Sequence, residues 1–190
     1  LITRLPVNQD GLLDLNKFEQ SIQEETILVS VMHVNNEIGV IQPIREIGAI
    51  CKERGIILHV DAAQSIGKIP VNVNEMGIDL LSISAHKLYG PKGVGALYMR
   101  RKDPRVQLQP IIFGGGHERG IRSGTLAVHN IVGLGKACKM AEKLMDRESR
   151  KIKSLRNHLL ESILSDDLNI KVNGSMDKRV AGNLNISFLG

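Results

Sequence analysis

The sequence predicts an α/β fold in which a mostly parallel β-sheet is flanked by helices. Short apolar runs rich in β-branched residues, typical of strands buried on both faces, alternate with polar connections, one of which has a helical pattern. Parallel neighbouring strands require such crossover connections. At 190 residues, 42% of them hydrophobic, the chain is long enough for one sizeable core or parts of two.

The N-terminal half predicts two buried strands separated by a helix. TILVSVMHV (26–34) is an apolar run that ends in the polar loop NNEIG. PIREIGAICKERG has a proline near a helix start, an apolar face, and Gly55 where the helix should end. IILHVDAAQS then predicts a second strand, which ends at Asp61.

Two more strands and a helical region follow. DLLSISAHK predicts a strand that ends at Lys87, and GVGALYMR predicts the next. After the glycine-rich stretch GGGHERGIRSGT (114–125), a helical pattern runs from about Ala127 to Asp146. A second helical segment, SRKIKSLRNHLLESIL, and two strand-like segments around IKV and NLNISF complete the chain.

The change from alternating elements to a long helix and new strands predicts a domain boundary. We assign residues 1–147 to a large domain with its connecting helix, and residues 148–190 to the beginning of a smaller α+β domain. The chain starts without an initiator methionine or signal-peptide pattern and stops within a strand-like segment, so we expect a fragment of a longer protein. No stretch approaches the roughly 20 apolar residues of a membrane helix.

Charge and cysteine content argue against several classes of function. The net charge is +5, but basic and acidic residues interleave in AEKLMDRESRKIKSLRN, and only 3% of residues are aromatic, with no tryptophan. Nucleic-acid modules usually combine a basic stripe with stacking aromatics. Cys51 and Cys138 are far apart and form no CxxC pair, which predicts neither a zinc site nor a disulfide framework and fits a reducing compartment.

Polar side chains follow three of the predicted strands, at the edge where open parallel sheets bind ligands. No metal-ligand spacing fits them. A carboxylate and an amine brought to one edge from separate strands, here Asp61 and Lys87, are what pyridoxal phosphate chemistry requires. The lysine holds the aldehyde of this cofactor, and the carboxylate keeps its ring nitrogen protonated. The sequence thus predicts a pyridoxal phosphate site.

Each of these residues alone has an ordinary structural explanation. Asp61 could cap a helix, Lys87 could be a surface lysine, His86 a core histidine and Asn36 a turn former. The glycines after Lys87 could merely shape a strand connection. GGGHERG could cradle a phosphate in a nucleotide-binding domain, although it matches neither the Walker pattern nor GxGxxG, and nucleotide binding requires no Asp and Lys pair.

Three stretches, HVDAAQSIGK, SISAHKLYGPKG and GGGHERGIRSGT, resemble the signatures of cysteine desulfurases of the IscS and NifS type. The resemblance implies the pyridoxal phosphate fold-type I of class V aminotransferases. It also implies conversion of L-cysteine to L-alanine, with the sulfur left as a persulfide on an enzyme cysteine for iron–sulfur cluster assembly. Selenocysteine lyases share the Asp and Lys patterns, but GHERGIRSGT favours the first group.

The resemblance also implies roles for single residues. Lys87 resembles the lysine that holds the cofactor covalently, and with His86 it forms the expected catalytic pair. Asp61 resembles the partner of the pyridine nitrogen. Asn36 and Gln64 resemble the residues that hold the ring's phenolic oxygen.

Phosphate binding and partners are implied in the same way. Ser84 and His86 resemble phosphate ligands, and Thr125 resembles a phosphate contact donated across a homodimer. Iron–sulfur scaffolds and sulfur-acceptor proteins, including tRNA-modifying ones, are the implied partners, in the bacterial cytoplasm or the mitochondrial matrix, with no membrane. Cys51 and Cys138 lie on apolar helix faces, so we expect the nucleophilic cysteine beyond Gly190. A non-catalytic interaction fragment of such an enzyme is the alternative.

Overall fold

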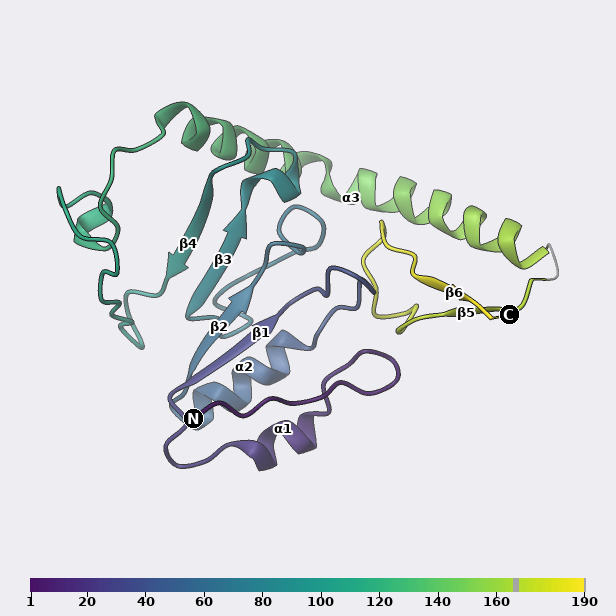
Figure 1. The fold of residues 1–190 in the computed structure, drawn as a ribbon, viewed down its shortest axis with the longest axis horizontal. Helices are drawn as coiled ribbons and strands as arrows, with labels where there is room; N and C mark the ends of the chain where they lie inside the picture. The colour runs from purple at the N-terminus through teal and green to yellow at the C-terminus, as the bar shows by residue number, and fades with distance from the viewer. Residues whose placement is uncertain (166–167, 190) are drawn as a thin grey trace.

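The computed structural model describes residues 1–165 and 168–189 and contains a four-stranded sheet in the order β1-β2-β3-β4 (Figure 1). The first three strands run parallel, and β4 pairs antiparallel with β3. The predicted mostly parallel sheet is therefore confirmed. The strands are β1 (Leu28–Met32), β2 (Ile57–Asp61), β3 (Leu80–Ser84) and β4 (Gly95–Met99).

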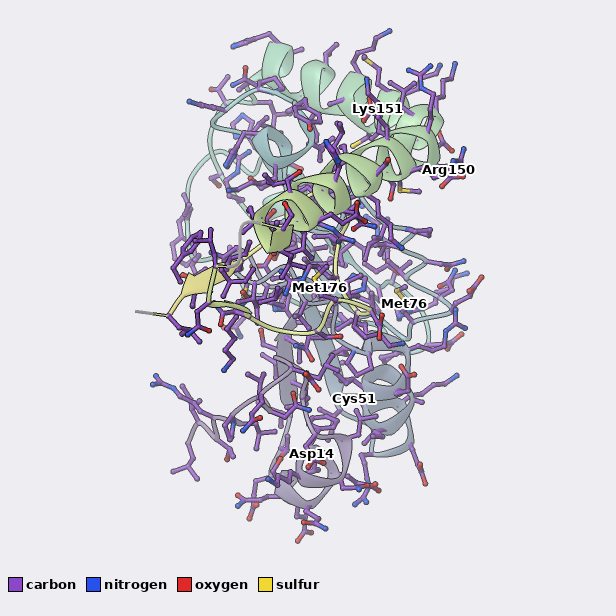
Figure 2. The ribbon with its side chains drawn as sticks, turned by 90° about the vertical axis from the view of Figure 1, so that its right-hand side faces the viewer. Asp14, Cys51, Met76, Arg150, Lys151 and Met176 are labelled. Carbon is purple, nitrogen blue, oxygen red and sulfur yellow. The ribbon has the colours of Figure 1, made fainter. Side chains whose placement is uncertain are left out.

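The core lies between one face of this sheet and the N-terminal helices. Helix α2 (Ile44–Glu53) buries Ile47 and Cys51 against Leu58 and Val60 of β2. A short helix that the sequence did not predict, α1 (Leu15–Ser21), is capped by the Asp14 carboxylate, which accepts hydrogen bonds from two backbone N–H groups (Figure 2). The opposite face of the sheet carries exposed apolar side chains: Leu28, Met32 and Leu97.

Helix α3 (Val128–Ser165) is continuous, so the prediction of two separate helical segments was wrong. Residues 146–149 include no glycine or proline, and nothing in their sequence ends a helix. The first part of α3 packs Leu134 and Ala137 against the end of β3, while Arg150 and Lys151 are exposed on its surface (Figure 2). The domain boundary at residues 147/148 stays a prediction.

A two-stranded antiparallel sheet, β5 (Ile170–Val172) and β6 (Ile186–Phe188), lies beside the C-terminal part of α3 (Figure 1). The segment between these strands contacts the loop after β1. Ile41 N–H donates to the Lys178 carbonyl at 2.8 Å, and Asn183 Nδ2 donates to the Glu37 carbonyl at 2.7 Å. These contacts fix the C-terminal segment near the carboxyl end of β1. No helix among the described residues is both long and apolar enough to cross a membrane.

Asp79 links the starts of β2 and β3 to the end of β4. Its carboxylate accepts from the Leu58 N–H at 3.0 Å and from Arg100 Nε at 2.9 Å, and its carbonyl accepts from the Arg100 N–H at 2.8 Å. The side chains of this ion pair are only 8% and 14% exposed. The Arg100 guanidinium also donates to the carbonyls of Val73 and Ile78, so its charge is satisfied locally.

We predict that Asp79→Ala lowers the free energy of unfolding by about 3 kcal/mol, because removing one partner leaves the other charge buried and unpaired. Urea denaturation followed by circular dichroism measures this change. Glu19→Ala is the control, since its ion pair with Arg54 is half-exposed and should contribute less than about 1 kcal/mol. Equal losses in the two variants would show that the buried pair does not hold the strands together.

Candidate functional site

The carboxyl ends of β2 and β3 place Asp61 and Ser84 at one edge and on one face of the sheet. Asp61 lies opposite Ser82 in the parallel register, and Ser84 follows two residues later on the same face. The Asp61 side chain is half-buried, and Oδ1 accepts from the Ala63 N–H at 2.9 Å. Among residues 1–165 and 168–189, Asp61 Oδ2 has no hydrogen-bond partner. One carboxylate oxygen is therefore available to a ligand.

A single turn of 3-10 helix, η1 (Ala85–Leu88), follows β3 and carries His86 and Lys87. Both side chains are exposed, whereas Ala85 and Leu88 are buried against α3. Ser84 Oγ and His86 Nδ1 are hydrogen-bonded at 3.0 Å. Alternating burial along this turn thus leaves an amine, an imidazole and a hydroxyl together at the sheet edge.

The glycines after Lys87 serve the chain reversal between β3 and β4. A Cβ atom at Gly90 would lie 2.9 Å from the Ala85 carbonyl oxygen, and one at Gly95 would lie 2.5 Å from that of Ile83. Both positions therefore require a glycine because the backbone itself passes close by. The structure supports the ordinary explanation of these glycines, a close strand connection.

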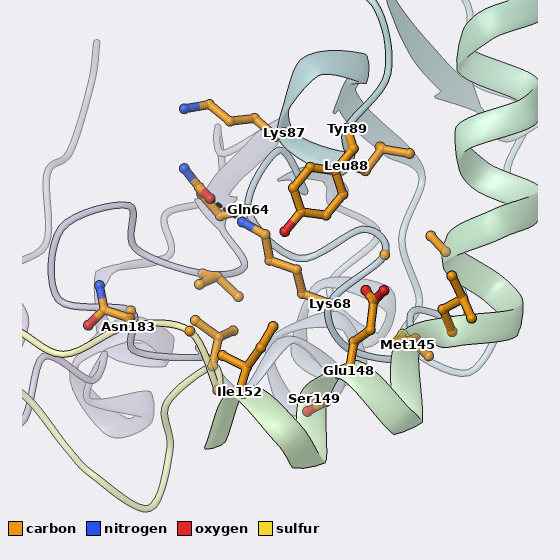
Figure 3. Close-up of a pocket in the computed structure, with 18 of the residues that line it drawn as sticks. Gln64, Lys68, Lys87, Leu88, Tyr89, Met145, Glu148, Ser149, Ile152 and Asn183 are labelled. Carbon is orange, nitrogen blue, oxygen red and sulfur yellow. Dashed lines mark hydrogen bonds between the residues drawn. The ribbon is translucent and has the colours of Figure 1, made fainter. Parts of the chain in front are cut away.

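A pocket of about 520 Å³ lies beside this edge, between η1, the turn after β2, helix α3 and the segment before β6 (Figure 3). Lys87, Gln64 and Asn36 are the predicted site residues that line it. Asp61, Ser84 and His86 lie at the adjoining strand ends, outside the pocket lining. The apolar wall comes from α3, through Ala137, Met140, Ala141, Leu144, Met145 and Ile152.

Lys68 and Glu148 also line the pocket, although no sequence pattern predicted either of them as a site residue. The Lys68 ammonium donates to Gln64 Oε1 at 2.6 Å. Burial lowers the pKa of Lys68, and the neighbouring charge of Lys87 lowers it further. The spacing of Gln64 and Lys68 in QSIGK was the available signal, since residues four apart in a tight turn can be neighbours.

His33 is a buried titratable group near the site, at the carboxyl end of β1. Its side chain is 3% exposed, and burial lowers its pKa from 6.5 to about 4. The imidazole is therefore neutral at pH 7. Within the described part of the chain, its Nδ1 has no hydrogen-bond partner. His33 therefore adds no charge to this edge of the sheet at pH 7.

Thr125 lies elsewhere, in the exposed segment between β4 and α3. Neither Thr125 nor any residue of the GGGHERG loop lines the pocket. The same segment contains the short turn η2 (Glu118–Gly120) and exposes the large apolar side chains of Ile111 and Phe113. Thr125 therefore does not join Lys87, Gln64 and Asn36 in the lining of the pocket.

The whole chain, residues 1–190, matches the family described as Aminotransferase class-V, and the chain belongs to that family. It is 58% identical over 187 residues to the cysteine desulfurase IscS of Actinobacillus succinogenes, covering 98% of this chain and 46% of that protein. It is 56% identical to a probable mitochondrial cysteine desulfurase of Dictyostelium discoideum, again over 98% of this chain but 41% of the relative. The chain thus spans under half the length of these relatives.

Solved structures show the same fold. A NifS-like protein superposes with a TM-score of 0.91 at 37% identity, covering 98% of this chain and 50% of that one. SspA in complex with cysteine superposes with a TM-score of 0.81 at 37% identity, covering 98% of this chain and 51% of that one. The expected fold, that of the fold-type I enzymes, is therefore confirmed.

The two cysteines are poorly placed for catalysis. Cys51 is 1% exposed, and its pKa is raised to about 11, mainly by burial and further by the charge of Asp79. Cys138 is half-buried and packs beside Leu134 and Ala137 of α3. Neither thiol lines the pocket next to Lys87.

We predict that iodoacetamide at pH 8 leaves Cys51 unmodified in the folded protein, because the reactive species is the thiolate and a thiol with a pKa of about 11 stays protonated there. Peptide mapping by mass spectrometry before and after unfolding in urea measures the modification. The unfolded chain should be alkylated at both cysteines. Rapid alkylation of Cys51 in the folded state would contradict its burial.

Proposed function

We propose that the full-length protein is a pyridoxal phosphate-dependent cysteine desulfurase, which converts L-cysteine to L-alanine and leaves the sulfur as a persulfide on one of its cysteines. The observation that carries this proposal is the placement of Asp61 at the end of β2 and of Lys87 in the turn directly after the neighbouring strand β3, at one edge of the sheet. The names of the relatives support the reaction, and the bound cysteine of SspA supports the substrate class.

The donor set at the edge fits pyridoxal phosphate. An exposed primary amine, Lys87, is available to the aldehyde, and the free Oδ2 of Asp61 is available to a protonated ring nitrogen. The hydrogen-bonded pair of Ser84 and His86 offers polar groups for a phosphate. Bound there, the cofactor would supply an electron sink for the substrate carbon.

The remaining work falls to the side chains of this chain. Asp61, as a carboxylate, would keep the proton on the ring nitrogen, because a negative neighbour favours the charged form. Lys87 would anchor the cofactor and then, once its amine is released, move protons at the substrate carbon. Asn36 and Gln64 would hold the phenolic oxygen from the pocket side.

A homodimer is part of the proposal. The segment with Thr125 is exposed and apolar at Ile111 and Phe113, as a surface that binds a second copy would be. Thr125 would then complete the phosphate site of the partner. Iron–sulfur scaffold and sulfur-acceptor proteins are the proposed partners, in the bacterial cytoplasm or the mitochondrial matrix, because both bacterial and mitochondrial relatives match.

We predict that borohydride reduction of the full-length protein with bound pyridoxal phosphate fixes the pyridoxyl group on Lys87, because this exposed amine lies beside the proposed phosphate ligands. Peptide mapping by mass spectrometry identifies the labelled residue. Lys68 and Lys92 are the internal controls and should stay unlabelled. Label on either of them, with none on Lys87, would refute the proposed anchor.

We predict that Asp61→Asn keeps the fold and retains cofactor but lowers the rate of alanine formation by about a hundredfold, because a neutral amide no longer holds the ring nitrogen protonated. A coupled alanine assay measures the rate. Asp177→Asn, at an exposed position, is the matched control and should stay within twofold of the parent. Asp79 cannot serve as this control, because its carboxylate is buried in an ion pair. A rate for Asp61→Asn within threefold of the parent would contradict its role.

A further inference from the structure

The contact between Lys68 and Gln64 determines which end of the Gln64 carboxamide faces the pocket. As an ammonium, Lys68 has only donors, so its partner must be the carbonyl oxygen, Oε1, at 2.6 Å. The other end, Nε2, carries the two N–H donors. In Figure 3, Nε2 points away from Lys68, toward the side of the pocket where Lys87 lies.

We propose that Lys68 is a positioning residue: it holds the Gln64 carboxamide so that Nε2 faces the Lys87 side and donates to the ring oxygen of the bound cofactor. Without Lys68, the carboxamide could rotate by half a turn and present Oε1 instead. An acceptor facing an ionised phenolic oxygen would be repelled, whereas a donor stabilises it. This inference deepens the proposed function and rests on it.

The charges around Lys68 fit this role. Lys87 and Tyr89 face the pocket from η1 and its end, and Glu148 faces it from α3 (Figure 3). The other lining residues from the β1 loop and from the segment before β6, among them Asn36 and Asn183, are uncharged. In the described part of the chain Lys68 forms no ion pair, even with Glu148. Its only side-chain hydrogen bond there is the one to Gln64.

The two lysines also act on each other. The positive charge of Lys87 contributes to the lowered pKa of Lys68, after burial. By the same coupling, the positive charge of Lys68 disfavours a second positive charge at the covalent linkage on Lys87. Removing Lys68 should therefore raise the pH at which this linkage loses its proton, and loss of the Gln64 donor acts in the same direction.

The test compares Lys68→Met, Gln64→Leu and the double variant of the full-length protein loaded with pyridoxal phosphate. We predict that Lys68→Met weakens cofactor binding about tenfold and raises the pH midpoint of the cofactor's absorbance change by about one unit. Absorbance titrations measure both quantities. In the Gln64→Leu background, Lys68→Met should weaken binding by less than twofold, because the contact it supports is already lost.

Three further variants and one labelling experiment distinguish a failure of this inference from a failure of the proposed function. Lys68→Arg keeps the charge and the donor, so the cofactor affinity and the pH midpoint should both match those of the parent. Lys139→Met removes an exposed charge on α3 and should change neither value. Lys68→Gln retains a donor for Gln64 and covers the case in which Lys68→Met fails to fold. Parent-like values for Lys68→Met, or fully additive losses in the double variant, would overturn the proposal. Absence of borohydride label on Lys87 in the parent would instead refute the proposed function.

Discussion

The positions of the functional side chains depend on the buried ion pair of Asp79 and Arg100. The Asp79 carboxylate accepts a hydrogen bond from the Leu58 N–H at the start of β2 and pairs with the Arg100 guanidinium. Asp79 directly precedes β3, and Arg100 directly follows β4. Each of these strands has five residues, so fixing one end of each strand also fixes its other end. A one-residue slip would turn Asp61 or Ser84 to the opposite face of the sheet. The ion pair thus acts at one end of the sheet to align the chemistry at the other.

The candidate site then forms where three kinds of structure meet at the aligned ends. The strands supply Asp61 and Ser84, the turn after β3 supplies His86 and Lys87, and α3 adds an apolar wall. The wall can lie close because Gly67, in the turn after β2, has no side chain. A Cβ atom at Gly67 would lie 3.0 Å from the Cβ atom of Ala141. The pocket is closed on another side by the segment before β6, which the backbone of Gly39 and Glu37 holds in place.

The sequence predicted the sheet well, because strands buried in a parallel sheet are apolar runs whose polar ends mark the binding edge. Asp61 ends β2 as predicted, whereas the prediction that the next strand ends at Lys87 was three residues too long: β3 ends at Ser84, and Lys87 lies in the turn η1 that follows it. The continuity of α3 was missed because a change in helical pattern can reflect a change of neighbours rather than a break: α3 passes from β3 to the C-terminal sheet with no glycine or proline at residues 146–149, where the pattern changes. Helix α1 was missed because its seven residues give little periodicity. The bond from Lys68 to Gln64 depends on a turn geometry that no periodic pattern encodes.

The pocket carries its charges in an arrangement that folding alone would not favour. Lys68 is half-buried near Lys87, and its lowered pKa reports the cost of keeping a cation there. An ion pair between Lys68 and Glu148, which lines the same pocket, would reduce that cost, yet none forms among the described residues. Instead, the ammonium bonds a neutral amide, whose N–H groups then point to the Lys87 side of the pocket. Local conflicts of this kind are expected where a site must accept an anionic ligand, and the proposed cofactor, with its phosphate and phenolic oxygen, is one.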